Sequence, residues 1–421
     1  MVTTIEKALY YSATARRALR DARKQKSHYR YPECIIRAQE SIEFAGKSML
    51  EFMDIEYKRE HYIGAELEKI GQKKPYLKEK VAKVIVTSDR WLQQSRNFTR
   101  YGFQKLGLPP KIAFSERDAK YALSDTEEII TLLDTVERSI KLCFPVKIAI
   151  LNGYVSEDRD NEVQCNDSSR TSISSAEWHK HLGGLQTDDE NAKYEVEFIS
   201  ASQISNRYMV VINPFGEVYP EIDIKKKVIF GIIEDYIFTG GIFVCAGGFP
   251  LFYGWDVNKG EKVPLVEGEI HLLSKIALHG DAVYVEEMKK LLPFSGTLLW
   301  KEFLAQTTGD TDKHSGPYPL DVTQTEEDIN KFGVLTDIGG KKEVLEFRAL
   351  IEKTKECIPL IRANRPDFGE VYPIAAIPHG YGYLLTHGMD IAKEYERQKA
   401  LASVDRFIEW LQKRYIRNKM K

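Results

Sequence analysis

Residues 240–248 read GGIFVCAGG, a short apolar run that ends on Cys245 and then meets small residues. This pattern predicts a buried parallel strand that delivers a thiol to a tight turn. Leu384–His387 is a second apolar run and ends on a histidine. Two readings of Cys245 stay open, because a strand-end thiol and imidazole can form a nucleophilic pair, whereas a cysteine inside a sheet can equally be inert core.

The chain from Val146 onward alternates short apolar runs with helical stretches. The runs at 147–151, 194–201 and 209–212 have strand character and are followed by polar or turn residues. Strands that alternate with helices predict a parallel sheet covered on both faces. Ligands of such sheets bind beyond the carboxyl ends of the strands, where 152–154, 213–217, 245–248 and 387–390 fall.

The chain before Val146 has helical spacing instead. Ile35, Ala38, Ile42, Ala45, Met49 and Phe52 recur at steps of three and four, which predicts one helix with one buried stripe. Ser124–Glu127 reads as a capping box that opens another helix, and Gly107–Pro110 as a break between helices. Only Val84–Val86 has strand character. We therefore expect an all-α bundle of about five helices over residues 1–144 and an α/β domain over 145–421.

Charge and cysteine content indicate which partners and which cellular compartment suit this protein. The 60 Lys and Arg nearly balance the 62 Asp and Glu, but residues 1–145 carry roughly +7 and the remainder roughly −9. A basic half suits an anionic partner such as RNA or a nucleotide, or is an ordinary solvated helical surface. The five cysteines are scattered without a CxxC pair, which favours reduced thiols and a cytoplasmic setting.

The sequence has no pattern typical of a membrane span, a signal peptide, a nucleotide cofactor site or a metal site. No apolar run is long enough to span a membrane, and the N-terminus lacks a signal pattern. No P-loop or GxGxxG sequence occurs, so we expect no cofactor. His179 and His181 have no third ligand of clear spacing, so we expect no metal site.

The N-terminal half resembles the HEPN domain family over about 140 residues. Residues 37–50 look like the second HEPN helix, and 95–102 are similar to a family segment that ends in Arg-Tyr-Gly. The resemblance implies a helical bundle that dimerises and binds nucleotide or RNA, through Arg96, Arg100, Tyr101 and His61. The Arg…His motif that the ribonuclease members carry on a late helix is absent from residues 60–145. Arg23 and His28 have the required spacing, but they lie at the end of the first helix. We therefore expect no RNase activity.

Residues 146–415 resemble the class I glutamine amidotransferase-like fold, a flavodoxin-like three-layer arrangement with a mainly parallel sheet. The resemblance places an oxyanion loop at Gly216, a nucleophile elbow at Cys245 and the triad histidine at His387. Two departures argue for a degenerate, ligand-binding version. Phe243 stands where active members have glycine, and Asp390 is the nearest acid after the histidine.

The sequence thus favours a non-catalytic binding or sensor protein that forms a homodimer. The helical domain would bind nucleotide or RNA, and the α/β domain a small ligand near Gly216, Ala246 and Gly247. The alternative is a cysteine-dependent amidohydrolase of the glutaminase type, which acts on a C–N bond with Cys245, His387 and Asp390 and with the Gly216 and Ala246 amides as oxyanion donors. A pure scaffold is a third reading. The first two differ in whether the Cys245 sulfur reaches the His387 ring in an open cleft.

Overall fold

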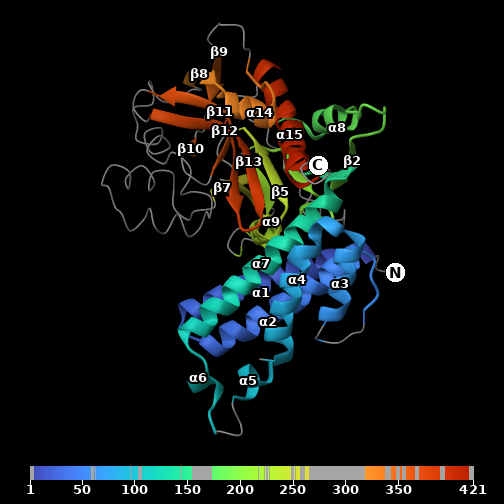
Figure 1. Ribbon diagram of the computed structural model, residues 1–421. Coiled ribbons are helices and arrows are strands. Elements are labelled where there is room, and N and C mark those ends of the chain that lie inside the picture. The colour runs from blue at the N-terminus through green and yellow to red at the C-terminus, as the bar shows by residue number, and fades with distance from the viewer. Residues whose placement is uncertain are drawn as a thin grey trace, which may run out of the picture. The chain divides into compact units, whose positions relative to one another are not determined.

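The computed structural model divides into two compact units (Figure 1). The helical unit contains Met1–Cys143 and the end of the chain from Arg414, and the α/β unit contains Phe144–Lys413. The expected boundary at 144/145 stays a prediction for limited proteolysis. The structure describes residues 4–57, 61, 63–94, 96–102, 107–143, 145–153, 173–216, 218–221, 223, 226, 228–247, 251, 253–256, 261–264, 318–336, 343–347, 351–352, 357–365, 369–388 and 394–416.

The helical unit is built around one central helix, α2, which lies against both α1 and α7. The predicted apolar stripe of α2 faces this contact, and its residues from Ile35 to Met49 are buried. Among the described residues, no helix is both long and apolar enough to cross a bilayer. The helices are α1 (Thr4–Ser27), α2 (Tyr31–Phe52), α3 (Gly64–Lys73), η1 (Pro75–Leu77), α4 (Lys78–Ser88), η2 (Asp89–Gln94), α5 (Arg96–Tyr101), α6 (Pro110–Ala113) and α7 (Glu116–Lys141).

Two local expectations for this unit are wrong. Helix α7 begins at Glu116, where Ser115 and Asp118 form the capping box, so Ser124–Glu127 lies inside the helix. Ala119, Ala122 and Leu123 are buried and extend the apolar spacing toward the N-terminus, which makes the earlier cap the effective one. Val84–Val86 is part of α4, because tertiary packing of one helical face outweighs the β preference of valine and isoleucine.

A buried ionic network joins α1 to α7. The Arg16 guanidinium donates to Ser12 at 3.0 Å, Glu137 at 2.8 Å and Asp134 at 3.2 Å. Burial lowers the pKa of Lys141, which reaches about 8, while the nearby Glu137 favours its charged form. Burial alone would raise the pKa of Glu137, but Arg16 and Lys141 outweigh it and the pKa is lowered. A buried network of this kind selects one alignment of two helices, because any other would leave charges unpaired.

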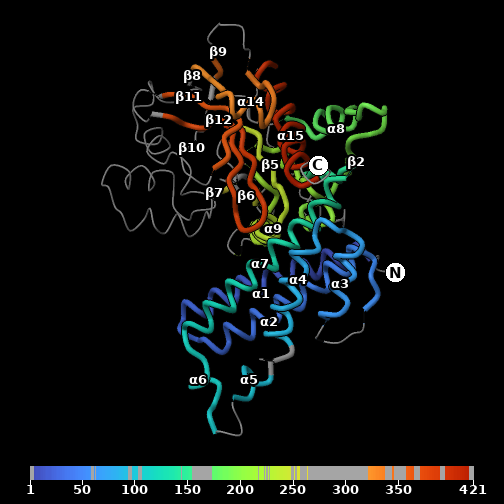
Figure 2. The backbone as a smooth tube through the Cα atoms, viewed as in Figure 1, coloured from blue at the N-terminus to red at the C-terminus, as the bar shows by residue number. Residues whose placement is uncertain are grey.

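The α/β unit contains a ten-stranded mixed sheet in the order β2-β1-β3-β5-β13-β12-β11-β8-β9, with β10 paired to β12 (Figure 2). Its first five strands are parallel, and the pairings from β13 to β9 are antiparallel. The expectation of a mainly parallel sheet therefore holds for one half only. The strands are β1 (Val146–Leu151), β2 (Tyr194–Ile199), β3 (Val210–Asn213), β5 (Ile242–Ala246), β8 (Tyr318–Thr323), β9 (Glu343–Phe347), β10 (Ile351–Glu352), β11 (Ile358–Arg365), β12 (Gly369–His379) and β13 (Gly382–His387).

Helices cover both faces of the parallel half. Phe243, Cys245 and Leu384 share one apolar cluster with Ile229 and Ile233 of α9. On the opposite face, the α15 side chains Ser403 and Phe407 contact His387 and Tyr383. The remaining described elements of this unit are α8 (Ser175–Gly183), η5 (Ala201–Gln203), α9 (Val228–Phe238), α14 (Glu326–Phe332), α15 (Glu394–Tyr415) and a small sheet of β4 (Val218–Glu221), β6 (Tyr253–Asp256) and β7 (Glu261–Pro264).

The glycines beside β5 and β13 serve close packing. A Cβ atom on Gly382 would lie 2.1 Å from the carbonyl oxygen of Gly241 and 2.2 Å from that of Ile237. A Cβ atom on Gly241 would lie 2.2 Å from the Tyr236 ring. The β12–β13 turn thus sits directly on the turn between α9 and β5, at the amino end of β5 and far from its carboxyl end. These glycines therefore align the strands.

We predict that Gly382→Ala lowers the free energy of unfolding of the α/β unit by about 2 kcal/mol or more, because backbone atoms must move to admit the methyl group. Gly231→Ala is the matched control. Gly231 lies on α9 with no atom within 4 Å of the added Cβ, so this change gains up to about 1 kcal/mol of helix propensity. Urea unfolding followed by circular dichroism measures both. Equal midpoints for the two variants would contradict the packing argument.

Candidate functional sites

The register of β5 against β13 separates the two strand-end groups. Cys245 pairs with Thr386, and His387 pairs with Ala246. Paired residues of neighbouring strands point to the same face of a sheet, and successive residues point to opposite faces. Cys245 therefore points toward α9, while His387 points toward α15.

Cys245 lies in the apolar core. Its side chain is 2% exposed, and burial raises the pKa of the thiol to about 12, although hydrogen bonds with the Asn213 side chain and the Leu251 backbone favour the thiolate slightly. A thiol with this pKa is protonated at neutral pH and is a poor nucleophile.

His387 is held by other partners. Its Nε2 atom forms a short hydrogen bond with Ser403 Oγ, and its Nδ1 atom lies 3.3 Å from the carbonyl oxygen of Cys245. Burial lowers the pKa of the imidazole to about 4, so the ring is neutral at pH 7. The alternative reading of Cys245 and His387 as a thiolate–imidazolium pair thus disagrees with the structure in both geometry and charge. Asp390, the expected third member, lies outside the described residues.

The residues that the resemblance assigns to an oxyanion and ligand loop, Gly216, Ala246 and Gly247, lie among backbone and side-chain hydrogen bonds. Gly216 and Gly247 adopt left-handed φ angles of 66° and 91°, as tight turns after strands require. The Gly247 N–H donates to the carbonyl oxygen of His387 at 2.6 Å, and Ala246 is fully buried within β5. The Asn213 amide donates to the carbonyl oxygens of Gly216 and Val218. The Gly247 amide is therefore already paired and is not available as an oxyanion donor in this structure.

We predict that iodoacetamide at neutral pH alkylates Cys143 at least about tenfold faster than Cys245 in the native protein, because only an exposed thiol reaches the reagent. Cys143 is an internal control, since it is exposed while Cys34, Cys245 and Cys357 are buried. Peptide mass spectrometry gives both rates in one sample. Fast alkylation of Cys245 that disappears in a His387→Ala variant would restore the catalytic reading.

The helical unit presents a second candidate site on α5. Arg100 is exposed and Tyr101 is 62% exposed. Gly102 ends the helix with a φ of 69°, and a Cβ atom there would lie 2.1 Å from the carbonyl oxygen of Leu108. The glycine of this Arg-Tyr-Gly segment is therefore required by its left-handed conformation and by the close approach of Leu108. Arg96 begins α5, but its side chain lies outside the described residues.

Two polar residues of α2, Gln39 and Glu43, form hydrogen bonds with α5 and His61. Gln39 accepts a hydrogen bond from Thr99 of α5 at 3.0 Å. One turn further along α2, both oxygens of Glu43 contact Nδ1 of His61, at 3.0 and 2.9 Å. His61 itself is 64% exposed at the side chain, so Glu43 fixes the ring while its other edge faces solvent. Sequence reasoning missed Gln39 and Glu43, although two polar residues four apart beside an apolar stripe were a visible signal.

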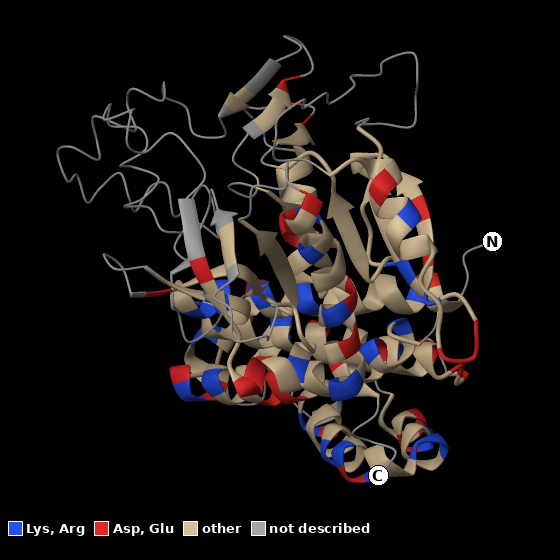
Figure 3. Ribbon diagram, turned by 90° about the horizontal axis from the view of Figure 1, so that it is seen from above, with Lys and Arg blue, Asp and Glu red and all other residues tan. Residues whose placement is uncertain are grey.

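Charge alone does not mark a binding face. Lys and Arg are interspersed with Asp and Glu along the helices (Figure 3). Many of the basic side chains are paired, as Arg23 is with Glu127 and Arg90 with Asp125. No group of three metal-ligating side chains occurs among the residues that the structure describes.

Residues 8–136 match the HEPN domain family, which confirms the resemblance stated for the N-terminal helical region. This part of the protein is a HEPN domain. No curated protein sequence matches the chain.

Solved structures give weak likenesses. A β-galactosidase from Bacillus circulans sp. alkalophilus has a TM-score of 0.32 at 12% identity, over 69% of this chain and 34% of that protein. A β-galactosidase from Rahnella sp. R3 has a TM-score of 0.32 at 11% identity, over 71% and 35%. An exo-β-1,4-mannosidase from an Opitutaceae bacterium, strain TAV5, has a TM-score of 0.28 at 9% identity, over 90% and 55%. The chain thus spans about a third to just over half of the length of these proteins. TM-scores this low do not establish a shared fold.

Proposed function

We propose that the HEPN domain binds RNA or a nucleotide through the exposed surface of α5. The observation that carries the proposal is an exposed tyrosine next to an exposed arginine on a short helix that Thr99 and Gln39 attach to α2. An arginine binds phosphate oxygens in a bidentate manner, and a tyrosine ring stacks on a base. His61, fixed by Glu43 one turn along α2 from the α5 contact, adds a second polar group. Homodimerisation through this domain is part of the proposal.

For the α/β unit we propose a flavodoxin-like, amidotransferase-like domain that binds a small ligand without cleaving it. Numbered by their place in the chain, its parallel strands lie in the order 2-1-3-4-5, which is the flavodoxin-like order. Ligands of such sheets lie at the carboxyl edge, where Gly216 and Gly247 follow β3 and β5. The burial of Cys245 and the neutral His387 favour binding over amide hydrolysis.

We predict that Arg100→Ala/Tyr101→Ala weakens binding of a fluorescein-labelled mixed-sequence 20-nucleotide RNA by about tenfold or more, since one phosphate contact and one stacked base are lost. The affinity of the unmodified protein should fall steeply between 50 and 200 mM salt, as counterion release requires. Fluorescence anisotropy measures both effects.

The control for this experiment is Arg23→Ala/Tyr29→Ala. It removes another exposed Arg and Tyr near the end of α1, where Tyr29 is 80% exposed. This variant should bind RNA as the unmodified protein does. Equal affinity of all three proteins would exclude α5 as the binding surface.

A further inference from the structure

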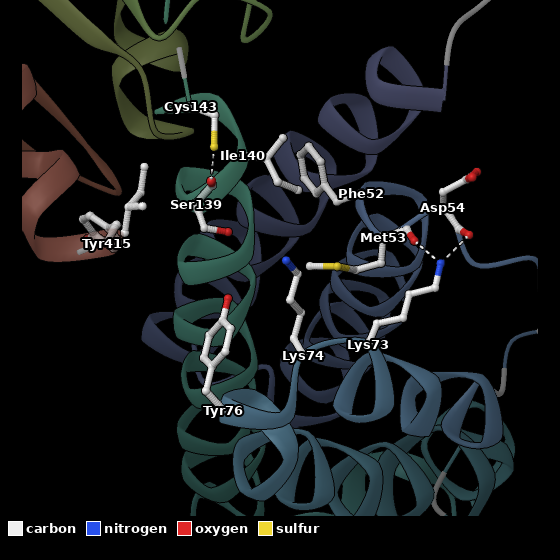
Figure 4. Close-up of a pocket in the computed structure, with 11 residues that line it drawn as sticks. Phe52, Met53, Asp54, Lys73, Lys74, Tyr76, Ser139, Ile140, Cys143 and Tyr415 are labelled. Carbon is white, nitrogen blue, oxygen red and sulfur yellow. Dashed lines mark hydrogen bonds between the residues drawn. The ribbon is translucent and has the colours of Figure 1, made fainter. Parts of the chain in front are cut away.

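A pocket of about 670 Å³ lies in the helical unit, within the size range of small-molecule sites. Phe52, Met53 and Ile140 supply apolar side chains, and Tyr76 and Tyr415 add aromatic rings (Figure 4). The complete lining is Phe52, Met53, Asp54, Lys73, Lys74, Tyr76, Ser139, Ile140, Cys143, Tyr415 and Ile416.

Two neighbouring lysines of this pocket differ in what they bind. The Lys73 ammonium donates to the carbonyl oxygens of Met53 and Asp54, at 2.8 and 3.1 Å, and so caps the end of α2. Lys74 has no hydrogen bond or ion pair with any residue that the structure describes. Its ammonium points into the pocket beside Met53 (Figure 4). The pocket thus combines apolar walls with one available cation.

Part of the pocket wall lies outside the residues that match the HEPN family. The HEPN match ends at residue 136, whereas Ser139, Ile140 and Cys143 follow it on the last turn of α7 and just beyond. Tyr415 and Ile416 come from the end of the chain, which belongs to the helical unit. Tyr415 is held in place because its hydroxyl donates to Asp134 at 3.0 Å and the Arg138 guanidinium lies 5.2 Å from its ring centre. A HEPN domain without these additions would lack this side of the pocket.

We propose that this pocket binds a small amphipathic carboxylate, with its alkyl body against Phe52, Met53 and Ile140 and its carboxylate at Lys74. Apolar burial supplies most of the binding free energy in such a site, and a charge-assisted hydrogen bond fixes the orientation. The excess of lysine over aspartate in the lining matches one negative charge. This site is separate from the α5 surface and does not depend on the function proposed above.

Cys143 provides a reporter for this site, because it lines the pocket and is exposed, with its thiol donating to the Ser139 carbonyl oxygen at 3.1 Å. Decanoate serves as the probe and decanol as its uncharged counterpart. Decanoate should slow alkylation of Cys143 by iodoacetamide in a saturable manner, and decanol should need about tenfold higher concentration. The full chain is used, and peptide mass spectrometry gives the rate at Cys143.

Lys74→Gln should raise the concentration of decanoate needed for half protection by about tenfold. Lys74→Glu should abolish protection, because it places a second negative charge at the carboxylate. Lys69→Gln is the matched control, since Lys69 is exposed on α3 outside the pocket, and it should change nothing. Circular dichroism melts verify folding, which these exposed positions should leave intact.

Three results would overturn the proposal. They are no protection of Cys143 at millimolar decanoate, equal protection by decanol, and equal loss of protection in the Lys69 and Lys74 variants. RNA binding is measured in the same Lys74 variants and should stay unchanged, which separates this site from the α5 surface.

Discussion

The alternation of side chains along β5 and β13 decides what the centre of the α/β unit can do. Each strand brings one reactive side chain to its carboxyl end, but the register places Thr386 beside Cys245 and Ala246 beside His387. A shift of one residue would bring thiol and imidazole to one face, at the cost of turning every side chain of the shifted strand to the opposite face and out of its present packing. The apolar packing of Phe243 and Leu384 on α9 therefore holds the two groups apart.

A comparable constraint organises the helical unit. Helix α2 packs its apolar residues against α1 and α7, and the polar positions beside them hold the peripheral segments. Gln39 holds α5 through Thr99, and Glu43 holds His61. The ionic network at Arg16 holds α1 against α7, the two helices that α2 packs against. The exposed Arg100, Tyr101 and His61, which we propose as the binding surface, thus lie on segments that α2 holds through hydrogen bonds.

The sequence allowed the two-part organisation and the HEPN resemblance to be predicted, because both rest on periodicity and on local motifs. The apolar stripe of α2 and the strands around Ile148, Val211 and Val244 are where the pattern placed them. The Ser124 cap was wrong because Ser115 offers a comparable motif, and the apolar spacing of Ala119, Ala122 and Leu123 continues the helix back to it. Which face of the sheet Cys245 and His387 point to depends on the register between β5 and β13. These two residues are 142 apart in the sequence, and no local sequence pattern determines such a register.

The most direct test of this account is the protonation state of His387 in the native protein. Proton–carbon NMR of the imidazole Cε1–H group, assigned by loss of one signal in His387→Asn, follows it with pH. We expect no titration between pH 5.5 and 8, and the same result in Cys245→Ser, because burial holds the pKa of His387 at about 4. A pKa at or above neutrality that shifts when Cys245 is replaced would mean that the two groups form an ion pair, and would contradict the account.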